Sequence, residues 1–170
     1  MEGENEFKIS REFNAPRELM FEMWTNPEHL NHWWGPAGMN ATTKKLELKP
    51  GGIFHYFIES PDGFTLYGRF IYKEIIRPEK LVFVVSFSDV NEGISRHPLA
   101  PTWPAEMLST IVFTERNGKT TLDMTAVALN ASEEEIKTFV DGFAGMNEGW
   151  GGTFSKLMNY LPMISLTDKI

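Results

Sequence analysis

At 170 residues, with ordinary hydrophobic (42%) and charged (23%) shares, the chain has the size and composition of one globular domain, which buries roughly two thirds of its unfolded surface. Its formal net charge of -7, with no run of lysine or arginine, argues against a nucleic-acid partner, and its lack of cysteine excludes disulfides and thiolate chemistry. Because residues 1–6 do not resemble a secretory signal and no apolar run could span a membrane, we expect a cytoplasmic protein without a membrane partner.

The N-terminal part of the sequence predicts one strand followed by two short helices. Apolar and polar residues alternate over residues 7–13, which is the period-two pattern of a half-buried strand. Apolar residues at helical spacing over residues 16–24 predict a first helix, and Pro16 is tolerated in its first turn. Asn26-Pro27 starts a second helix, which Gly35-Pro36 ends.

An antiparallel meander is predicted next. Strand-like runs separated by Gly- and Pro-containing turns span residues 41–48, 53–59, 64–75 and 81–87. Two further strands, at residues 107–114 and 120–127, flank Asn117-Gly118, a dipeptide typical of a tight hairpin because both positions accept positive φ.

A long helix is predicted to close the fold. Ser132 and Glu135 have the spacing of a capping box, an apolar stripe follows to Leu161, and Pro162 is predicted to end the helix. About thirty residues would span roughly 45 Å, so we expect a bend or break near the glycines of residues 142–152. Residues 1–170 therefore predict a single α+β domain with a helix-grip fold, in which a curved antiparallel sheet wraps around a long C-terminal helix and two short helices separate the first two strands.

The sequence contains only incomplete matches to motifs of catalytic, metal-binding or cofactor-binding sites. Gly118-Lys119-Thr120 lacks the upstream glycine of a phosphate-binding loop, and the glycines from Gly142 onward lack the spacing of a dinucleotide motif. His29 and His32 have no evident third partner for a metal ion. No serine elbow or assignable carboxylate pair is present, so the sequence predicts no metal, no cofactor and no catalytic residue.

The predicted site is a pocket between the sheet and the last helix. In a helix-grip fold, the same face of that helix packs in the core and lines the pocket. Residues 89–104 form a long connection whose Trp103 either covers the pocket or plugs the core. A register slip of one residue would exchange the strand residues that point inward. The residues predicted to line the pocket are Trp34, Phe54, His55, Tyr56, Tyr67, Arg69, Phe70, Trp103, Phe139, Phe143, Met146 and Trp150.

Several short motifs in the chain follow one another in a characteristic order. They are Asn14-Ala15-Pro16-Arg17-Glu18, Trp24-Thr25-Asn26-Pro27-Glu28-His29-Leu30, Trp33-Trp34-Gly35-Pro36, Pro50-Gly51-Gly52 and Gly149-Trp150. Together they resemble the Activator of Hsp90 ATPase homologue 1-like family of the START/Bet v 1-like superfamily, over about residues 7–161. The resemblance implies a deep cavity of the kind that this superfamily uses for lipids, sterols and polyketides.

Three functions stay open at the level of sequence. Binding of a small hydrophobic molecule of unknown identity is the leading hypothesis, and burial of about 300 Å² of apolar surface would favour it by about 7 kcal/mol before association costs, which predicts micromolar or weaker affinity. A polyketide cyclase- or dehydratase-like enzyme would need an inward-facing acid or base, with His55 as the first candidate. A protein-interaction role, on an Hsp90-type chaperone in a stress response or in a homodimer, would use an exposed apolar patch.

Overall fold

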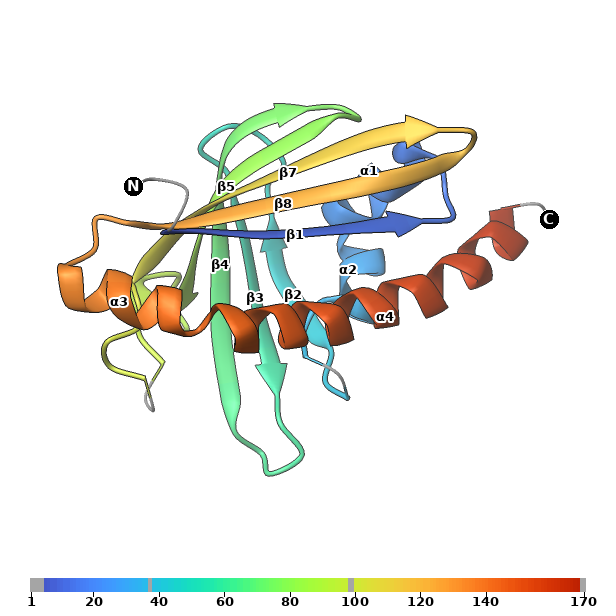
Figure 1. Ribbon diagram of the computed structural model, residues 1–170. Coiled ribbons are helices and arrows are strands. Elements are labelled where there is room, and N and C mark those ends of the chain that lie inside the picture. Colours follow the sequence, from blue (N-terminus) through green and yellow to red (C-terminus); the bar gives the residue numbers. More distant parts are fainter. Residues whose placement is uncertain (1–4, 37, 98–99, 169–170) are drawn as a thin grey trace.

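The computed structural model describes residues 5–36, 38–97 and 100–168, and it confirms the predicted α+β helix-grip fold (Figure 1). In chain order, the elements are β1 (Glu6–Phe13), α1 (Arg17–Thr25), α2 (Pro27–Trp33), β2 (Ala41–Leu46), β3 (Ile53–Glu59), β4 (Thr65–Ile76), β5 (Lys80–Ser88), β6 (Ile94–Ser95), β7 (Glu106–Arg116), β8 (Lys119–Leu129), α3 (Glu133–Asp141) and α4 (Phe143–Asp168). The strands form an 8-stranded antiparallel sheet in the order β1-β8-β7-β5-β4-β3-β2, and β6 pairs with β5. The long helix α4 crosses the concave side of this curved sheet.

Local sequence signals explain where several elements turn or begin. Asn117 and Gly118 have φ values of 54° and 76°, as expected for the tight hairpin between β7 and β8. The Ser132 hydroxyl accepts a hydrogen bond from the Glu135 N–H, and the Glu135 carboxylate accepts one from the Ser132 N–H, so the predicted capping box begins α3. Strand β6 is absent from the prediction because its two residues are too few to show a periodic pattern.

The predicted C-terminal helix is divided at Gly142, where α3 ends and α4 starts. The Gly142 N–H is shared between the carbonyl oxygens of Thr138 and Phe139, both at 3.1 Å. A Cβ atom on Gly142 would lie 3.0 Å from Cζ3 of Trp103. The break therefore falls where the chain needs a residue without a side chain, because the Trp103 indole approaches the backbone closely.

The prediction that Pro162 ends the last helix is wrong. Helix α4 continues through Pro162 to Asp168. Proline lacks the N–H that would bond to the carbonyl of Met158, but this loss removes only one rung of the helical ladder. Both Met158 and Pro162 are exposed, so water can solvate the carbonyl that loses its partner.

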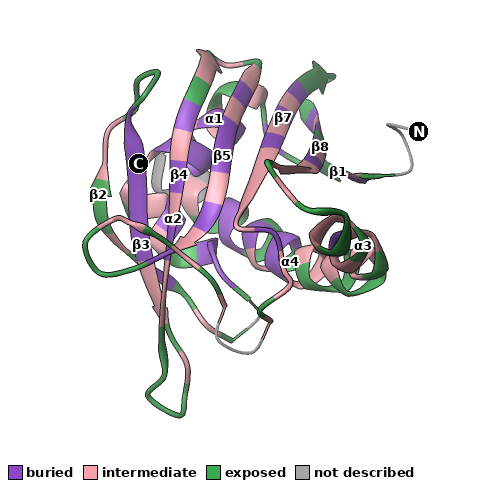
Figure 2. Ribbon diagram, turned by 90° about the vertical axis from the view of Figure 1, so that its left-hand side faces the viewer, coloured by how far each residue is buried: buried purple, intermediate pink, exposed green. Residues whose placement is uncertain are grey.

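The core fills the space between the concave face of the sheet and the helices, where Figure 2 shows buried residues along the strands and on α4. The Phe13 ring meets the Phe154 ring edge-on with centroids 5.6 Å apart, which joins β1 to α4. Trp24 and Trp33 bring α1 and α2 into the same core, with ring centroids 4.9 Å apart. The Trp33 indole N–H donates to the Met23 carbonyl at 3.0 Å, so this buried polar group is satisfied.

We predict that alanine at Gly145 and at Gly142 will have different effects on stability. At Gly145 the added methyl group meets no atom within 4 Å outside the local helix backbone, and the higher helix propensity of alanine should stabilise the fold by about 0.5–1 kcal/mol. At Gly142 the same methyl group would press on Trp103, so the gain should be smaller or absent. Urea unfolding measures both changes, and an equal gain at the two positions would contradict the close packing of Trp103.

Candidate ligand-binding groove

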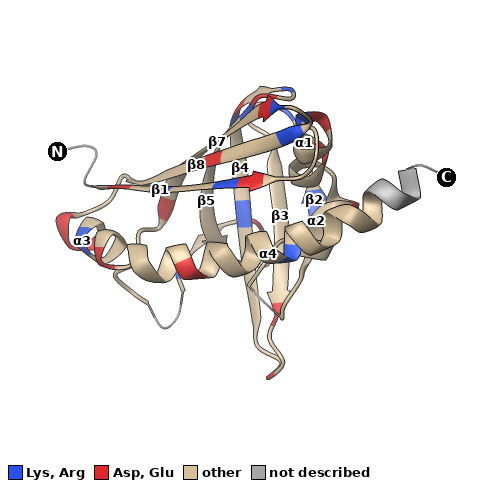
Figure 3. Ribbon diagram, turned by 45° about the vertical axis from the view of Figure 1, so that its right-hand side comes forward, with Lys and Arg blue, Asp and Glu red and all other residues tan. Residues whose placement is uncertain are grey.

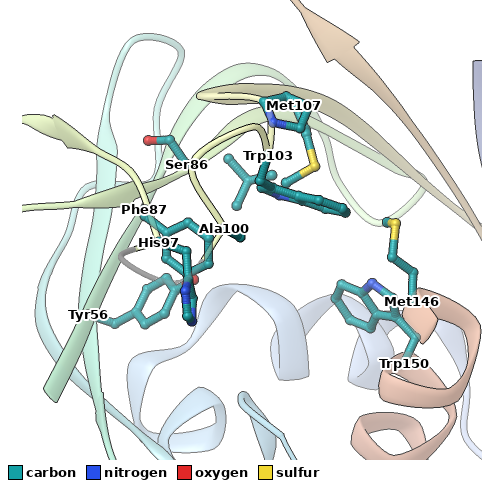
Figure 4. A pocket seen from close by; sticks show the side chains of 11 residues that line it. Tyr56, Ser86, Phe87, His97, Ala100, Trp103, Met107, Met146 and Trp150 are labelled. Atoms are coloured by element: carbon teal, nitrogen blue, oxygen red, sulfur yellow. The ribbon is translucent and has the colours of Figure 1, made fainter. Parts of the chain in front are cut away.

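Two adjoining hollows lie between the concave face of the sheet and α4. The first has a volume of about 320 Å³ and the second a volume of about 420 Å³. Both are bordered by Tyr56, Phe87, Met146 and Trp150, so they form one groove. The first hollow is also lined by Val85, Ser86, His97, Ala100, Trp103, Pro104 and Met107 (Figure 4). The second hollow is also lined by Trp34, Gly35, Pro36, Ile58, Gly149 and Thr153.

The walls of the groove come from opposite layers of the fold. Figure 4 shows Tyr56 of β3 and Phe87 of β5 on one side, and Met146 and Trp150 of α4 on the other. Met146 and Trp150 lie one helical turn apart and therefore share a face of α4. Trp103, from the connection between β6 and β7, lies at the end of the groove near the break between α3 and α4. Aromatic rings and methionine side chains therefore form much of the groove wall.

Strand register decides which residues of β3 and β4 face the groove. Tyr56 pairs with Gly68, and His55 pairs with Arg69. Because successive side chains on a strand point to opposite faces, Tyr56 faces α4, whereas His55 and Arg69 point away from it. Tyr67 stacks on the His55 ring with centroids 5.8 Å apart, so it belongs to the opposite face as well.

His55 is buried on that opposite face under the connection that follows β5. Its side chain is 2% exposed, and its Nε2 atom lies 2.9 Å from Ser88 Oγ and 3.1 Å from the Asp89 carbonyl oxygen. These contacts satisfy the Nε2 atom within the protein. His55 therefore holds the end of β5 in place and points away from the groove.

Arg69 ties the same connection to the sheet at a second point. Its Nε donates to Ser86 Oγ at 3.2 Å, and its Nη1 donates to the Glu92 carbonyl oxygen at 2.6 Å. Charge-assisted hydrogen bonds of this kind are among the stronger ones in proteins. Arg69 thus fixes the turn between β5 and β6.

Gly68 leaves room for the Tyr56 ring in the groove wall. A Cβ atom on Gly68 would lie 2.4 Å from both Cζ and the hydroxyl oxygen of Tyr56. The Tyr56 ring also meets the Trp34 ring edge-on, with centroids 6.0 Å apart. Burial raises the pKa of Tyr56 to about 12, and a side-chain hydrogen bond with Trp34 partly opposes this shift. Tyr56 therefore presents a neutral phenol at neutral pH.

Thr153 and Lys156 fix the end of the groove that lies near α2. The Thr153 hydroxyl donates to the Gly35 carbonyl at 3.0 Å. The Lys156 ammonium donates to the carbonyls of Gly35 at 3.2 Å and Pro36 at 3.1 Å, and also to that of Met39. Desolvation lowers the pKa of Lys156. Helix α4 therefore supplies one wall of the groove and also holds the loop that forms its end.

The structure divides the predicted pocket residues into three groups. The residues that line the groove are Trp34, Tyr56, Trp103, Met146 and Trp150. The residues that lie in the core or pack against it, outside the groove, are Phe54, Phe70, Phe139 and Phe143. The residues on the opposite face of the sheet are His55, Tyr67 and Arg69.

Some groove residues were missed by the sequence analysis. Val85 and Phe87 alternate within a predicted strand, so the period-two pattern could have assigned them to one face. Gly149 and Thr153 continue the helical spacing of the groove face of α4. His97 lies in a connection without periodicity, and no sequence signal placed it in the groove.

His29 and His32, considered above as a metal pair, both contact Tyr160. His29 Nδ1 lies 2.7 Å from the Tyr160 hydroxyl, and the His32 ring stacks on the Tyr160 ring with centroids 4.7 Å apart. Within residues 5–36, 38–97 and 100–168, no three His, Cys, Asp or Glu side chains are grouped to hold a metal ion. No helix in this part of the chain has the length and apolar character needed to cross a membrane.

Comparison with known proteins agrees with this architecture. Residues 14–162 match the model of the family described as Activator of Hsp90 ATPase homolog 1-like protein. Protein Ms6760 from Mycobacterium smegmatis is 25% identical with a TM-score of 0.75, and the match covers 94% of this chain and 91% of that chain. A protein from Nitrosomonas europaea is 21% identical with a TM-score of 0.74, over 98% of this chain and 99% of that one.

A larger protein contains a similar fold in part of its length. DynU16, described as a protein in the dynemicin biosynthetic locus, is 18% identical with a TM-score of 0.63, and the match covers 93% of this chain but 47% of that chain. At this level of identity the likeness concerns the fold alone. No curated protein matches the chain.

We predict that ionisation of Tyr56 will destabilise the fold at alkaline pH. Its pKa is about 12 in the native state and 10.0 ordinarily, so its stabilising contribution is complete below pH 10 and is lost as pH rises through 12. Tyr56→Phe cannot ionise and should lose stability less steeply across this range. Tyr72, whose pKa burial also raises, remains in the variant and retains part of the slope. Urea unfolding across this pH range measures both slopes, and equal slopes would contradict the assignment to Tyr56.

We also predict a strong energetic coupling between Gly68 and Tyr56. Gly68→Ala should destabilise the fold by about 1–3 kcal/mol, because the new methyl group overlaps the Tyr56 ring. In a Tyr56→Ala background the ring is gone, so the same change at Gly68 should cost little. A double-mutant cycle by urea unfolding measures the coupling. Simple additivity of the two single changes would show that Gly68 does not accommodate the ring.

Proposed function

Because the chain belongs to the Activator of Hsp90 ATPase homolog 1-like family, and because its helix-grip fold contains an apolar groove, we propose that it binds a small hydrophobic molecule between the sheet and α4. The observation that carries this proposal is the composition of the groove wall. Tyr56, Phe87, Met146 and Trp150 border both hollows, and aromatic and apolar side chains form most of the remaining lining.

The side chains of the groove wall are partly exposed to water, so covering them with a ligand would contribute favourably to the free energy of binding. Phe87, Met146 and Trp150 are partly exposed, whereas the core aromatics Phe13 and Phe154 are fully buried. A ligand that covered the wall would remove this apolar surface from water, at about 25 cal/mol per Å². After the entropic cost of association, we expect affinities in the micromolar range.

The two ends of the groove are already ordered by the protein itself. Arg96 binds the Trp103 carbonyl at one end, and Thr153 and Lys156 hold the loop at Gly35 at the other. Preorganisation of this kind lowers the entropic cost of ligand binding. The ordered ends therefore support the proposal that the groove binds a ligand.

The alternative of an enzyme gains no support from the position of its first candidate residue. His55 would have to reach the groove to act as an acid or base, but it lies on the opposite face of the sheet, bonded to Ser88 and Asp89. No observation in the described part of the chain favours an Hsp90-type partner over a small molecule. Binding is therefore the function that the geometry supports best.

We predict that the neutral fluorophore 1-aminoanthracene will bind in the groove and gain fluorescence with micromolar affinity. Met146→Glu should weaken binding at least tenfold, because the bound ligand would strip water from the new carboxylate. Met158→Glu is the matched control, since Met158 lies on the same helix, 43% exposed, and outside the groove. Fluorescence titration measures all three affinities.

The outcomes of this titration separate the groove from other binding surfaces. Retained binding in Met146→Glu, or equal losses in the two variants, would place the fluorophore elsewhere. No binding to the unaltered protein would count against the proposed function. Circular dichroism of each variant verifies that the helices are intact.

A further inference from the structure

We propose that the groove selects uncharged, flat aromatic molecules and discriminates against both anionic ligands and flexible alkyl chains. This inference rests on the proposed binding function and adds the chemical class of the ligand. It follows from three features of the site. Both walls are aromatic, no Asp, Glu, Lys or Arg among the described residues lines the groove, and the nearest cations are hydrogen-bonded to other parts of the protein.

The aromatic walls favour a planar ligand. Tyr56 and Phe87 face Met146 and Trp150 across the first hollow (Figure 4). In the second hollow, the Trp34 and Trp150 rings lie 5.3 Å apart at an interplanar angle of 59°, so they present two faces of an aromatic corner. Ring–ring and sulfur–ring contacts add to the energy of area burial, and a rigid ring system loses little conformational entropy on binding. An alkyl chain of similar size gains neither advantage.

The groove offers no countercharge. Among the described residues, none that lines either hollow is Asp, Glu, Lys or Arg. Most of the α4 ribbon is uncharged in Figure 3, and by sequence Glu148 and Lys156 are its charged residues between Phe143 and Ile164. A buried charge without a partner is costly, so an ionised ligand would lose solvation without compensation.

The cations nearest to the groove are engaged with the protein. Lys156 adjoins the second hollow through the loop at Gly35, but its ammonium donates to three backbone carbonyls, which uses all of the donors that a lysine has. Arg96, which precedes His97 and adjoins the first hollow, donates from Nη1 to the Trp103 carbonyl oxygen at 2.9 Å and to the Glu135 carboxylate at 2.5 Å. Arg69 lies on the far side of the sheet. The net charge of -7 further disfavours anions at long range. A fatty acid or other anionic amphiphile thus finds an apolar groove without a site for its head group.

Three probes of matched size test this selectivity by displacement of 1-aminoanthracene. They are 2-acetylnaphthalene, which is flat and neutral, 2-naphthoate, which replaces the acetyl group by a carboxylate, and 2-dodecanone, which keeps the carbon number and the ketone but is flexible. We expect 2-acetylnaphthalene to displace the fluorophore at concentrations at least tenfold lower than either of the other two probes.

A change of one residue should reverse the charge preference. Met146→Lys introduces a cation into the groove, so 2-naphthoate should then bind more tightly than 2-acetylnaphthalene, a relative shift of at least a hundredfold. Met158→Lys adds the same charge to an exposed position of the same helix and should leave the original preference unchanged. The comparison therefore separates a local effect in the groove from a change in net charge.

The possible results distinguish this inference from the function on which it rests. If 1-aminoanthracene binds but 2-naphthoate or 2-dodecanone displaces it as well as 2-acetylnaphthalene does, the groove binds hydrophobic molecules and the aromatic selectivity is wrong. If Met146→Lys still binds 2-acetylnaphthalene more tightly than 2-naphthoate, the absence of a positive charge in the groove does not explain the preference. If the fluorophore does not bind at all, the proposed function itself fails.

Discussion

The packing of α4 along the concave face of the sheet determines both the core and the groove. In the middle of the helix, Phe154 and Leu157 are fully buried, and Phe154 meets Phe13 of β1 edge-on. Toward its N-terminal end, the same face carries Met146 and Trp150, which remain partly exposed beside the two hollows. The same helix face is therefore closely packed at Phe154 and Leu157 and borders the groove at Met146 and Trp150.

Polar contacts outside the groove order several loops of the fold. Arg96 holds the Trp103 segment, Lys156 holds the loop that follows α2, and His55 and Arg69 hold the turn between β5 and β6 on the far side of the sheet. Each uses a charged or polar side chain to bind backbone carbonyls, which a loop without regular structure cannot satisfy by itself. The lining of the groove stays largely apolar, because the charged side chains that bind these carbonyls are not among its lining residues.

The sequence predicted the elements well and the faces of the strands less well. Asn117-Gly118 and the Ser132 capping box are local signals whose geometry depends on neighbouring residues alone, and both appear in the structure as expected. The inward or outward direction of His55 depends on its pairing with Arg69 across the sheet, and a pattern of mostly apolar residues on β3 leaves that choice open. Pro162 misled the prediction because a proline near an exposed helix end removes one hydrogen bond without ending the helix.

Trp150 shows why the core and the groove cannot be separated energetically. Its ring stacks on fully buried Trp24 with an interplanar angle of 19° and a centroid distance of 6.2 Å, and it also packs on Phe154. The same side chain borders both hollows. A flat molecule in the groove would extend an aromatic cluster that already joins α1 to α4. Ligand binding and the docking of α4 would then reinforce each other, since a molecule that binds the native state alone stabilises it by mass action.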